Sequence, residues 1–224
     1  MRIRFKKWAR PELEASKFYI DEPEKYKGKW QSLFGNNNPL CLELGCGKGS
    51  FISQLASENS NKNYVAIDLV DAMLGLAKRN IESVYKEENK EIDNVYITRY
   101  DIDRILNIFD ENDKIERIYI NFCNPWPRGK HHKKRLTHSR QLEKYKTFLT
   151  NGGEIYFKTD DDNLFVDSLT YFKEAGLKIE KITYNLAEEE DFWNGDINIE
   201  TEHEKMFKDQ GIKIKALIAK NTKE

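Results

Sequence analysis

Short runs of β-branched and aromatic residues alternate with longer segments of helical periodicity after residue 38. The short runs predict seven strands, over residues 40–44, 64–68, 95–100, 117–122, 154–158, 178–184 and 212–219. The helical patterns predict helices over residues 49–57, 71–85, 139–149, 161–174 and 202–210. Alternation of this kind is typical of an α/β fold, in which helices cover both faces of a mainly parallel sheet.

The two ends of the chain depart from this alternation. The last two predicted strands are separated by a loop and one short helix, and no full crossover unit follows. We therefore expect a doubly wound, mainly parallel sheet of seven strands with an antiparallel strand at its edge. Residues 1–37 are rich in charge and contain Pro11, Pro23 and Gly28, which predicts an N-terminal extension to one Rossmann-like domain over residues 38–224.

Composition limits the class of protein. Hydrophobic residues make up 39% of the 224 residues, which is enough for a packed core. No stretch approaches the roughly 18 apolar residues of a membrane-spanning helix, and the first residues lack the apolar region of a signal peptide. Three cysteines without a CxxC pair suit a reducing compartment. We therefore expect a cytoplasmic protein that contacts no membrane, as a monomer or a homodimer.

Charge is segregated along the chain, although the net charge is only −1. Residues 1–10, here called the basic arm, contain five basic residues and no acid: Arg2, Arg4, Lys6, Lys7 and Arg10. Residues 128–135 form a second acid-free basic cluster, and residues 188–204 contain eight carboxylates and no lysine or arginine. A basic face could bind a phosphate backbone, and on composition alone two solvated charge runs are an equally good interpretation.

The first predicted strand leads into a glycine-rich turn, Glu43-Leu44-Gly45-Cys46-Gly47-Lys48-Gly49. Gly45, Gly47 and Gly49 allow a tight turn and let a ligand approach the backbone. Asp68 ends the second strand, 19 residues later, where a carboxylate can accept hydrogen bonds from both hydroxyls of a ribose. The G-x-G-x-G spacing and the acidic Glu43, which would repel a pyrophosphate, favour S-adenosylmethionine over a nicotinamide dinucleotide.

Asp101 closes the third predicted strand. The carboxyl ends of adjacent strands form the ligand crevice of open α/β sheets, so this carboxylate could accept a hydrogen bond from an adenine amino group. A helix N-cap is an equally good interpretation of the same residue.

The fourth predicted strand leads into Asn121-Phe122-Cys123-Asn124-Pro125-Trp126-Pro127, and the basic cluster follows directly. Two prolines around a tryptophan predict a rigid, extended loop. A polar side chain, an aromatic face and phosphate-binding charges thus lie within a few residues of one another. This combination suits a base taken out of its stack, with Trp126 as a stacking or packing surface.

This string resembles the signature N-F-x-D-P-W-P-K-K-R-H-x-K-R-R-L of the bacterial tRNA (guanine-N7) methyltransferases. Three further segments match that family in order and spacing: Glu43–Gly49, Lys158-Thr159-Asp160 and Thr201-Glu202-His203-Glu204. Trp8-Ala9-Arg10-Pro11-Glu12 fits as well. The resemblance covers nearly the whole chain. It implies a class I S-adenosylmethionine-dependent methyltransferase fold and methylation of guanosine N7 at position 46, in the variable loop of tRNA.

Carried over residue by residue, the resemblance implies three sets of positions. The cofactor-binding set is Glu43, Gly45, Gly47, Gly49, Asp68, Asp101 and Asn124. The substrate-binding set is Arg128, Lys130, His131, His132, Lys133, Lys134, Arg135, Asp160, Thr201, Glu202, His203 and Glu204. The catalytic position of the family falls on Asn124, and Asp160 is the second catalytic candidate.

Asn124 is the main departure from the family, which usually has aspartate there. Guanine N7 has a lone pair and no proton, so its attack on a sulfonium methyl group needs no base. Alignment of the reactants can contribute roughly 7–11 kcal/mol to such a step, and an aspartate would add stabilisation of the cationic product. We therefore predict an active enzyme in which Asn124 orients substrate or cofactor through its amide, while Asp160 supplies negative charge.

Two candidate substrate residues also have structural interpretations. Asp160 could accept hydrogen bonds from guanine N1–H and N2–H₂, whereas one acid of the run 160–162 is expected to cap the next helix. Thr201 and Glu204 have the spacing of a capping box, and both roles are compatible because a capped helix N-terminus is an anion site. The four histidines lack metal-ligand spacing with the cysteines, so no metal is expected.

Two other functions remain open at this stage. Asn124-Pro125-Trp126 also resembles the loop of methyltransferases that modify the exocyclic amino group of adenine, although Pro127 and the basic cluster do not fit that loop. Alternatively, the chain is an RNA-binding homologue whose catalysis is weakened by Asn124. The intact glycine-rich turn with Glu43 and Asp68 favours an enzyme over this second alternative.

Overall fold

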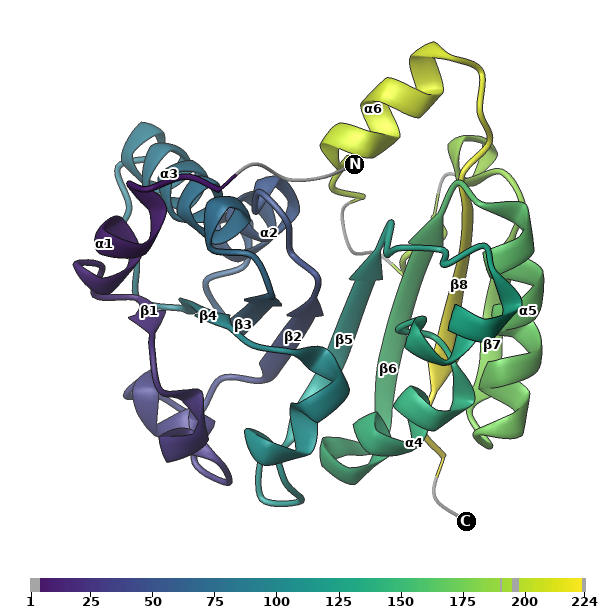
Figure 1. The fold of residues 1–224 in the computed structure, drawn as a ribbon, viewed down its shortest axis with the longest axis horizontal. Coiled ribbons are helices and arrows are strands. Elements are labelled where there is room, and N and C mark those ends of the chain that lie inside the picture. The colour runs from purple at the N-terminus through teal and green to yellow at the C-terminus, as the bar shows by residue number, and fades with distance from the viewer. Residues whose placement is uncertain (1–4, 190, 195–197, 223–224) are drawn as a thin grey trace. The chain divides into compact units, whose positions relative to one another are not determined.

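The computed structural model describes residues 5–189, 191–194 and 198–222. The chain divides into two compact units, Met1–Asp113 and Lys114–Glu224. Within the described residues each unit contains four strands with helices packed on them (Figure 1). Arg2 and Arg4 of the basic arm lie outside the described residues.

The first unit is built on four parallel strands in the order β1-β4-β3-β2. Their bounds are Tyr19–Ile20 for β1, Leu40–Leu44 for β2, Asn63–Asp68 for β3 and Val95–Arg99 for β4. All five residues of β2 are buried, which is typical of a parallel strand covered on both faces. In this register Asp68 lies opposite Arg99, so the carboxyl ends of β3 and β4 finish side by side.

Two α-helices follow the inner strands of this unit, α2 (Ser50–Glu58) after β2 and α3 (Asp71–Glu87) after β3. They approach most closely at Gly49, where a Cβ would lie 2.6 Å from the Cβ of Ala77. A third helix, α1 (Ala9–Glu14), packs against α3. The 3₁₀ helices are η1 (Pro23–Tyr26), η2 (Trp30–Leu33) and η3 (Ile102–Asn107).

The segment before β2 is packed into the first unit. Trp30 is fully buried, its ring stacks on Phe109 at 5.2 Å, and its indole N–H donates to the carbonyl of Ile108 at 2.7 Å. The carboxylate of Asp113 accepts hydrogen bonds from the backbone N–H groups of Gly28 and Trp30. These contacts fix residues that the sequence suggested were an extension, and the boundary at residue 38 stays a prediction.

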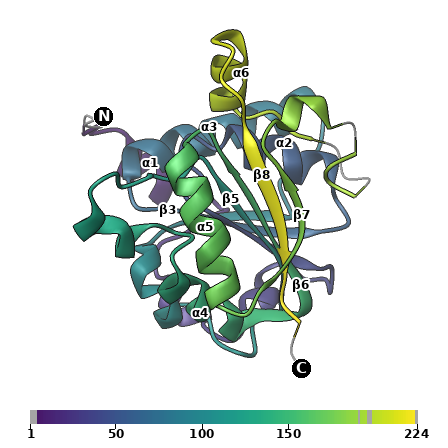
Figure 2. The same cartoon turned by 90° about the vertical axis from the view of Figure 1, so that its right-hand side faces the viewer.

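The second unit has four strands in the order β5-β6-β8-β7. Their bounds are Ile115–Asn121 for β5, Leu149–Thr159 for β6, Lys178–Thr183 for β7 and Lys215–Lys220 for β8. β5 and β6 are parallel, and β8 runs antiparallel to both β6 and β7. Figure 2 shows β8 between these two neighbours.

The helices of the second unit are α4 (Ser139–Phe148), α5 (Asp162–Glu174) and α6 (Glu202–Asp209), with the 3₁₀ helices η4 (Gly129–Lys134) and η5 (Leu186–Glu188). α5 packs against the sheet through Phe165, whose ring stacks on Phe157 of β6 at 6.2 Å. α6 lies beyond the carboxyl ends of β5 and β6 (Figure 1). Within the described residues, no helix is long and apolar enough to cross a membrane.

The predicted α/β class, the mainly parallel strands and all five predicted helices are confirmed. Two details differ. The antiparallel strand lies one place in from the edge, because β8 pairs with β7 as well as with β6. The described residues hold an eighth strand, β1, whose two residues are too few to produce a detectable alternation.

Candidate functional site

The glycine-rich turn after β2 depends on glycine backbone conformations. Gly45, Gly47 and Gly49 have φ angles of 81°, 55° and 72°, in the left-handed region where other residues are strained. A Cβ on Gly49 would collide with Ala77, whereas a Cβ on Gly47 would meet nothing within 4 Å. Gly49 is therefore needed for helix packing, and Gly47 leaves open space into which a ligand can approach the backbone.

Asp68 holds this turn from the end of β3. Its Oδ2 accepts a hydrogen bond from the N–H of Gly47 at 2.9 Å, and its Oδ1 accepts one from the N–H of Val70 at 2.9 Å. Burial raises the pKa of the Asp68 carboxyl, and hydrogen bonds from Val70 and Gly47 oppose that rise. Each carboxylate oxygen keeps lone-pair capacity for a second donor, so Asp68 can accept from ribose hydroxyls while it holds the turn.

Glu43 lies one residue before the end of β2 and is only 2% exposed. The thiol of Cys46 is buried nearby, and burial raises its pKa, with Asp68 and Glu43 adding to the rise. The thiol therefore stays neutral between two acids. A buried acid beside a turn that is open at Gly47 suits a cationic ligand group better than a phosphate.

Asp101 is exposed at the start of η3, where its carboxylate accepts a hydrogen bond from the N–H of Asp103 at 3.0 Å. The capping interpretation is thus confirmed for this residue. Adenine binding by Asp101 stays a prediction.

In the second unit, the loop after β5 has an unusual backbone. Phe122 and Trp126 have φ angles of 49° and 43°, which bulky residues rarely adopt. The N–H of Phe122 donates to the carbonyl of Lys158 at 2.9 Å, which fixes the beginning of the loop. Strained backbone of this kind is concentrated at functional sites, and here it brackets Asn124.

Asn124 is exposed, and its side-chain oxygen accepts a hydrogen bond from the N–H of Trp126 at 2.9 Å. An aspartate would form the same turn, so the replacement of the family's aspartate by asparagine preserves this local geometry. Because the oxygen is used by the turn, the NH₂ group of Asn124 is the part that can donate to a ligand. The predicted orienting role through the amide is compatible with this arrangement.

Arg135 differs from the rest of the basic cluster because its side chain is only 1% exposed. Its guanidinium donates to the carbonyl of Pro125 at 2.7 Å, pairs with Asp167 of α5, and lies 3.1 Å from Nε2 of His132. It therefore connects the Pro125–Pro127 loop to α5. The predicted contact of Arg135 with RNA is untested, and its burial favours a role in holding the loop.

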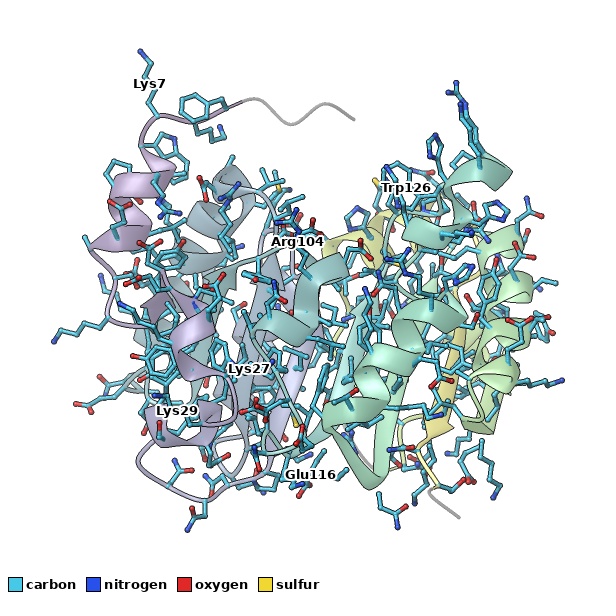
Figure 3. The ribbon with its side chains drawn as sticks, turned by 60° about the horizontal axis from the view of Figure 1, so that its bottom comes forward. Lys7, Lys27, Lys29, Arg104, Glu116 and Trp126 are labelled. Carbon is cyan, nitrogen blue, oxygen red and sulfur yellow. The ribbon has the colours of Figure 1, made fainter. Side chains whose placement is uncertain are left out.

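The remaining cations of the cluster lie on the surface. Arg128, Lys130, Lys133 and Lys134 are exposed, and His131 and His132 are half-buried. Trp126 lies beside η4 (Figure 3), with the His131 ring at 5.7 Å and the Lys134 ammonium 5.0 Å from its ring centroid. The loop thus presents an aromatic ring among cations, as the sequence suggested for RNA contact.

The acids after β6 have separate partners. Asp161 caps α5 by accepting a hydrogen bond from the N–H of Leu164 at 2.6 Å, and Asp162 pairs with Lys215. In the described part of the chain, no hydrogen bond or ion pair involves the carboxylate of Asp160. The capping role therefore falls on Asp161, and Asp160 keeps its acceptors for a ligand.

α6 is fixed by a capping box and a buried ion pair. Thr201 Oγ1 accepts from the N–H of Glu204 at 3.0 Å, and Glu204 accepts from the N–H of Thr201 at 3.2 Å, which confirms the capping box. Glu204 also pairs with Lys158 of β6 at 2.7 Å, and these side chains are 7% and 3% exposed. This burial favours a structural role for Thr201 and Glu204, whereas Glu202 and His203 are exposed.

His203 links α6 to the loop after β5, because its ring stacks on Phe122 with centroids 5.6 Å apart. Within the second unit, Asn124, Asp160 and the start of α6 are thus brought to the carboxyl ends of β5 and β6. Sequence reasoning missed Lys158 and Asp167, whose partners lie 46 and 32 residues away. A lysine inside an otherwise apolar strand was the available signal for Lys158. In the described residues no group of three or more metal-ligating side chains occurs.

Solved structures with the same fold are methyltransferases. The 16S rRNA methyltransferase KamB superposes with a TM-score of 0.62 at 14% identity, covering 87% of this chain and 93% of its own. An antibiotic-related methyltransferase gives 0.59 at 16% identity, with 86% and 92% covered. The model of a family described as putative methyltransferase matches residues 37–217. Fold and sequence together define a methyltransferase.

The relatives are more specific. A tRNA (guanine-N(7)-)-methyltransferase of Clostridium beijerinckii is 59% identical over 221 residues, which cover 98% of each chain. A protein of the same name from Clostridium botulinum is 58% identical over 219 residues, again covering 98% of each chain. This chain belongs to the family of tRNA (guanine-N(7)-)-methyltransferases.

Proposed function

We propose that this chain transfers a methyl group from S-adenosylmethionine to N7 of a guanosine in tRNA, at the variable-loop position 46 that the resemblance implies. The observation that carries the proposal is the 59% identity, over 98% of both chains, to a protein named for this activity. The residues of both units are chemically compatible with it.

The first unit has the groups that S-adenosylmethionine requires. When bound, this cofactor supplies a methyl group on a positively charged sulfur. Gly47 leaves the backbone open, Asp68 has oxygens available for ribose hydroxyls, and Glu43 provides a buried negative charge for the cationic end. Asp101 is the remaining candidate, for the adenine amino group.

The second unit has the groups that would bind and orient a guanine. Asp160 can accept from guanine N1–H and N2–H₂ together, which adenine cannot satisfy, and Asn124 can donate through its NH₂ group. In the transfer, the N7 lone pair forms a bond to the methyl carbon as the carbon–sulfur bond breaks, and its electron pair remains on sulfur. No proton leaves N7, so these residues act by alignment and by stabilising the positive charge that develops on the base.

The test is transfer of tritiated methyl groups from S-adenosylmethionine to unmodified tRNA, followed by strand scission at 7-methylguanosine to locate the modified base. We expect label at a single guanosine of the variable loop. Label on an adenine amino group, or cofactor binding without transfer to any tRNA, would contradict the proposal and favour one of the two alternative functions.

Variants of the two orienting residues divide the labour of the site. We expect Asn124→Ala to slow single-turnover methylation about 10-fold or more, the loss of roughly one charge-assisted hydrogen bond, and Asn124→Asp to retain or exceed the wild-type rate because it keeps the turn. Asp160→Asn is expected to raise the KM for tRNA. A full single-turnover rate in Asn124→Ala, or normal tRNA turnover in Asp160→Asn, would remove the corresponding residue from the mechanism.

A further inference from the structure

The described part of the basic arm presents an exposed aromatic ring beside two exposed cations. Phe5 is 81% exposed, and Lys6 and Lys7 are exposed as well. Within the described residues, neither lysine forms an ion pair. Figure 3 shows Lys7 extending away from the start of α1. A large exposed apolar side chain next to unneutralised cations is typical of a surface that binds another molecule.

This segment is attached firmly to α3 through Trp8. The guanidinium of Arg79 lies 3.8 Å from the centroid of the Trp8 ring, and Arg79 pairs with Glu12 of α1 at 2.6 Å. The other contact is with Gly75, where a Cβ would come within 2.7 Å of the Trp8 ring and 2.9 Å of the Ala9 side chain. Trp8 therefore packs against a site on α3 that only glycine leaves open.

The attachment lies at the carboxyl edge of the parallel strands. Arg10, two residues after Trp8, has its Nη1 3.8 Å from the carboxylate of Asp71, the first residue of α3. Arg99, at the end of β4, lies 3.3 Å from the same carboxylate. This is the edge where Asp68 and Gly47 form the candidate cofactor site, and ligands of open α/β sheets bind at such an edge.

We propose that Phe5, Lys6 and Lys7 form an RNA-binding element that Trp8 fixes beside the cofactor-binding edge of the first unit. The inference rests on the proposed function, since tRNA is the RNA in question. Lys6 and Lys7 bind backbone phosphates, and the ring of Phe5 stacks on an unpaired base. The clamped Trp8 limits the entropy that is lost when the element binds.

The test compares the full-length wild type with a Lys6→Gln/Lys7→Gln variant in tRNA binding measured at several salt concentrations. Each lost phosphate contact lowers the slope of log K against log salt by about 0.7–0.9, so the advantage of the wild type falls about tenfold between 50 and 200 mM salt. The matched control is Lys27→Gln/Lys29→Gln, which removes two exposed lysines from another part of the same unit (Figure 3). The control is expected to retain the wild-type slope.

Phe5→Ala and Trp8→Ala test the aromatic contributions. Phe5→Ala removes an exposed ring, so folding is unaffected, and the loss of one stacked base weakens tRNA binding about 5-fold or more. Trp8→Ala raises the KM for tRNA while the kcat at saturating tRNA and the affinity for S-adenosylmethionine stay near wild type, and Trp8→Phe restores part of the loss. A purely structural role of Trp8 would instead lower all three quantities together.

The possible failures are distinguishable. Wild-type methylation of tRNA together with an unchanged salt slope in Lys6→Gln/Lys7→Gln would overturn the RNA-binding element and leave the proposed function intact. A wild type that binds tRNA but methylates no guanosine would overturn the proposed function, and the same binding series would still decide on the element. An equal loss of slope in the Lys27→Gln/Lys29→Gln control would also overturn the inference, because any surface lysine would then serve.

Discussion

The two candidate binding regions are held in place by different means. In the first unit, the glycine-rich turn and Asp68 are fixed through backbone hydrogen bonds between residues 21 or fewer positions apart. In the second unit, the loop around Asn124 and the start of α6 depend on two buried cationic side chains. Arg135 reaches Asp167 across 32 residues, and Lys158 reaches Glu204 across 46.

This difference bears on how each region responds to substitution. A backbone-built turn tolerates changes in its side chains but not a Cβ where the chain needs a positive φ. A region held by buried ion pairs tolerates changes in its surface cations, but it fails when one buried partner is removed. The four predictions below test this contrast, from the largest expected effect to the smallest.

The largest effect is expected at the buried pair of Lys158 and Glu204. Lys158→Met leaves the Glu204 carboxylate buried without its cation, which should lower the free energy of unfolding by about 3–5 kcal/mol. Urea denaturation measures this change. In the double variant Lys158→Met/Glu204→Leu the loss should shrink, since no uncompensated charge remains.

Lys208→Met is the control for this pair. Lys208 also lies on α6, and its ion pair with Glu200 is exposed, with side chains 65% and 37% accessible. Its loss should cost less than about 1 kcal/mol. Equal effects of Lys158→Met and Lys208→Met would show that the buried pair does not hold α6.

The second prediction concerns Gly49 of the turn. Gly49→Ala adds the steric conflict with Ala77 to the strain of a positive φ, so it should destabilise the protein by about 2–4 kcal/mol. Gly35→Ala is the matched control, because Gly35 has a φ of 64° and open space around its Cα. Its cost should be limited to the about 1–2 kcal/mol of backbone strain. Chemical denaturation of both variants gives the difference, and identical losses would remove the packing role of Gly49.

The third prediction separates Arg135 from its exposed neighbours. Arg135→Lys keeps the charge but loses the geometry that joins Pro125, Asp167 and His132, so stability should fall by about 1–3 kcal/mol and tRNA methylation should slow. Affinity for S-adenosylmethionine, measured by calorimetry, should not change. Arg128→Lys, an exposed substitution in the same cluster, should stay within about 0.5 kcal/mol of wild type. If both variants behave alike, Arg135 does not hold the loop.

The smallest effect is expected from pH. His138 caps α4 by accepting a hydrogen bond from the N–H of Arg140 through Nδ1, which requires a neutral ring. Burial lowers the pKa of His138 below its usual value of 6.5. The unfolded chain therefore takes up the proton first, and the stability from this cap is present above pH 6.5 and is lost as the pH falls further.

Asn at position 138 provides the comparison, since it caps without titrating. Between pH 7.5 and 5.5 the wild type should lose more stability than His138→Asn, by less than about 1 kcal/mol, the range of one cap. Thermal unfolding at both pH values measures the difference. A larger acid-induced loss in His138→Asn would contradict the assignment.

The same contrast explains what the sequence could predict. The strands, the main helices, the glycine-rich turn, the Thr201 capping box and the capping of α5 by an acid depend on residues close together in the sequence, and they are confirmed. The burial of Arg135 and the pairing of Lys158 depend on residues that meet only after folding, and the basic cluster therefore looked uniform.

The segment before residue 38 shows the same limit. α1 has six residues and β1 has two, so neither produces a periodicity that stands out from the surrounding charged residues. Trp30 and Trp8 gave the only local sign of packing there, and their partners Phe109 and Gly75 lie far along the chain. The order of β8 and β7 escaped sequence reasoning because it is set by pairing between strands.

The position of β8 has a consequence for synthesis of the chain. During translation β6 and β7 leave the ribosome before the strand that pairs with both of them, so each exposes an unsatisfied edge until Lys215–Lys220 emerges. Nascent chains arrested before this point therefore carry two open edges that can join those of other chains. We accordingly expect the last ten residues to decide whether newly made protein accumulates as a folded species or as aggregate.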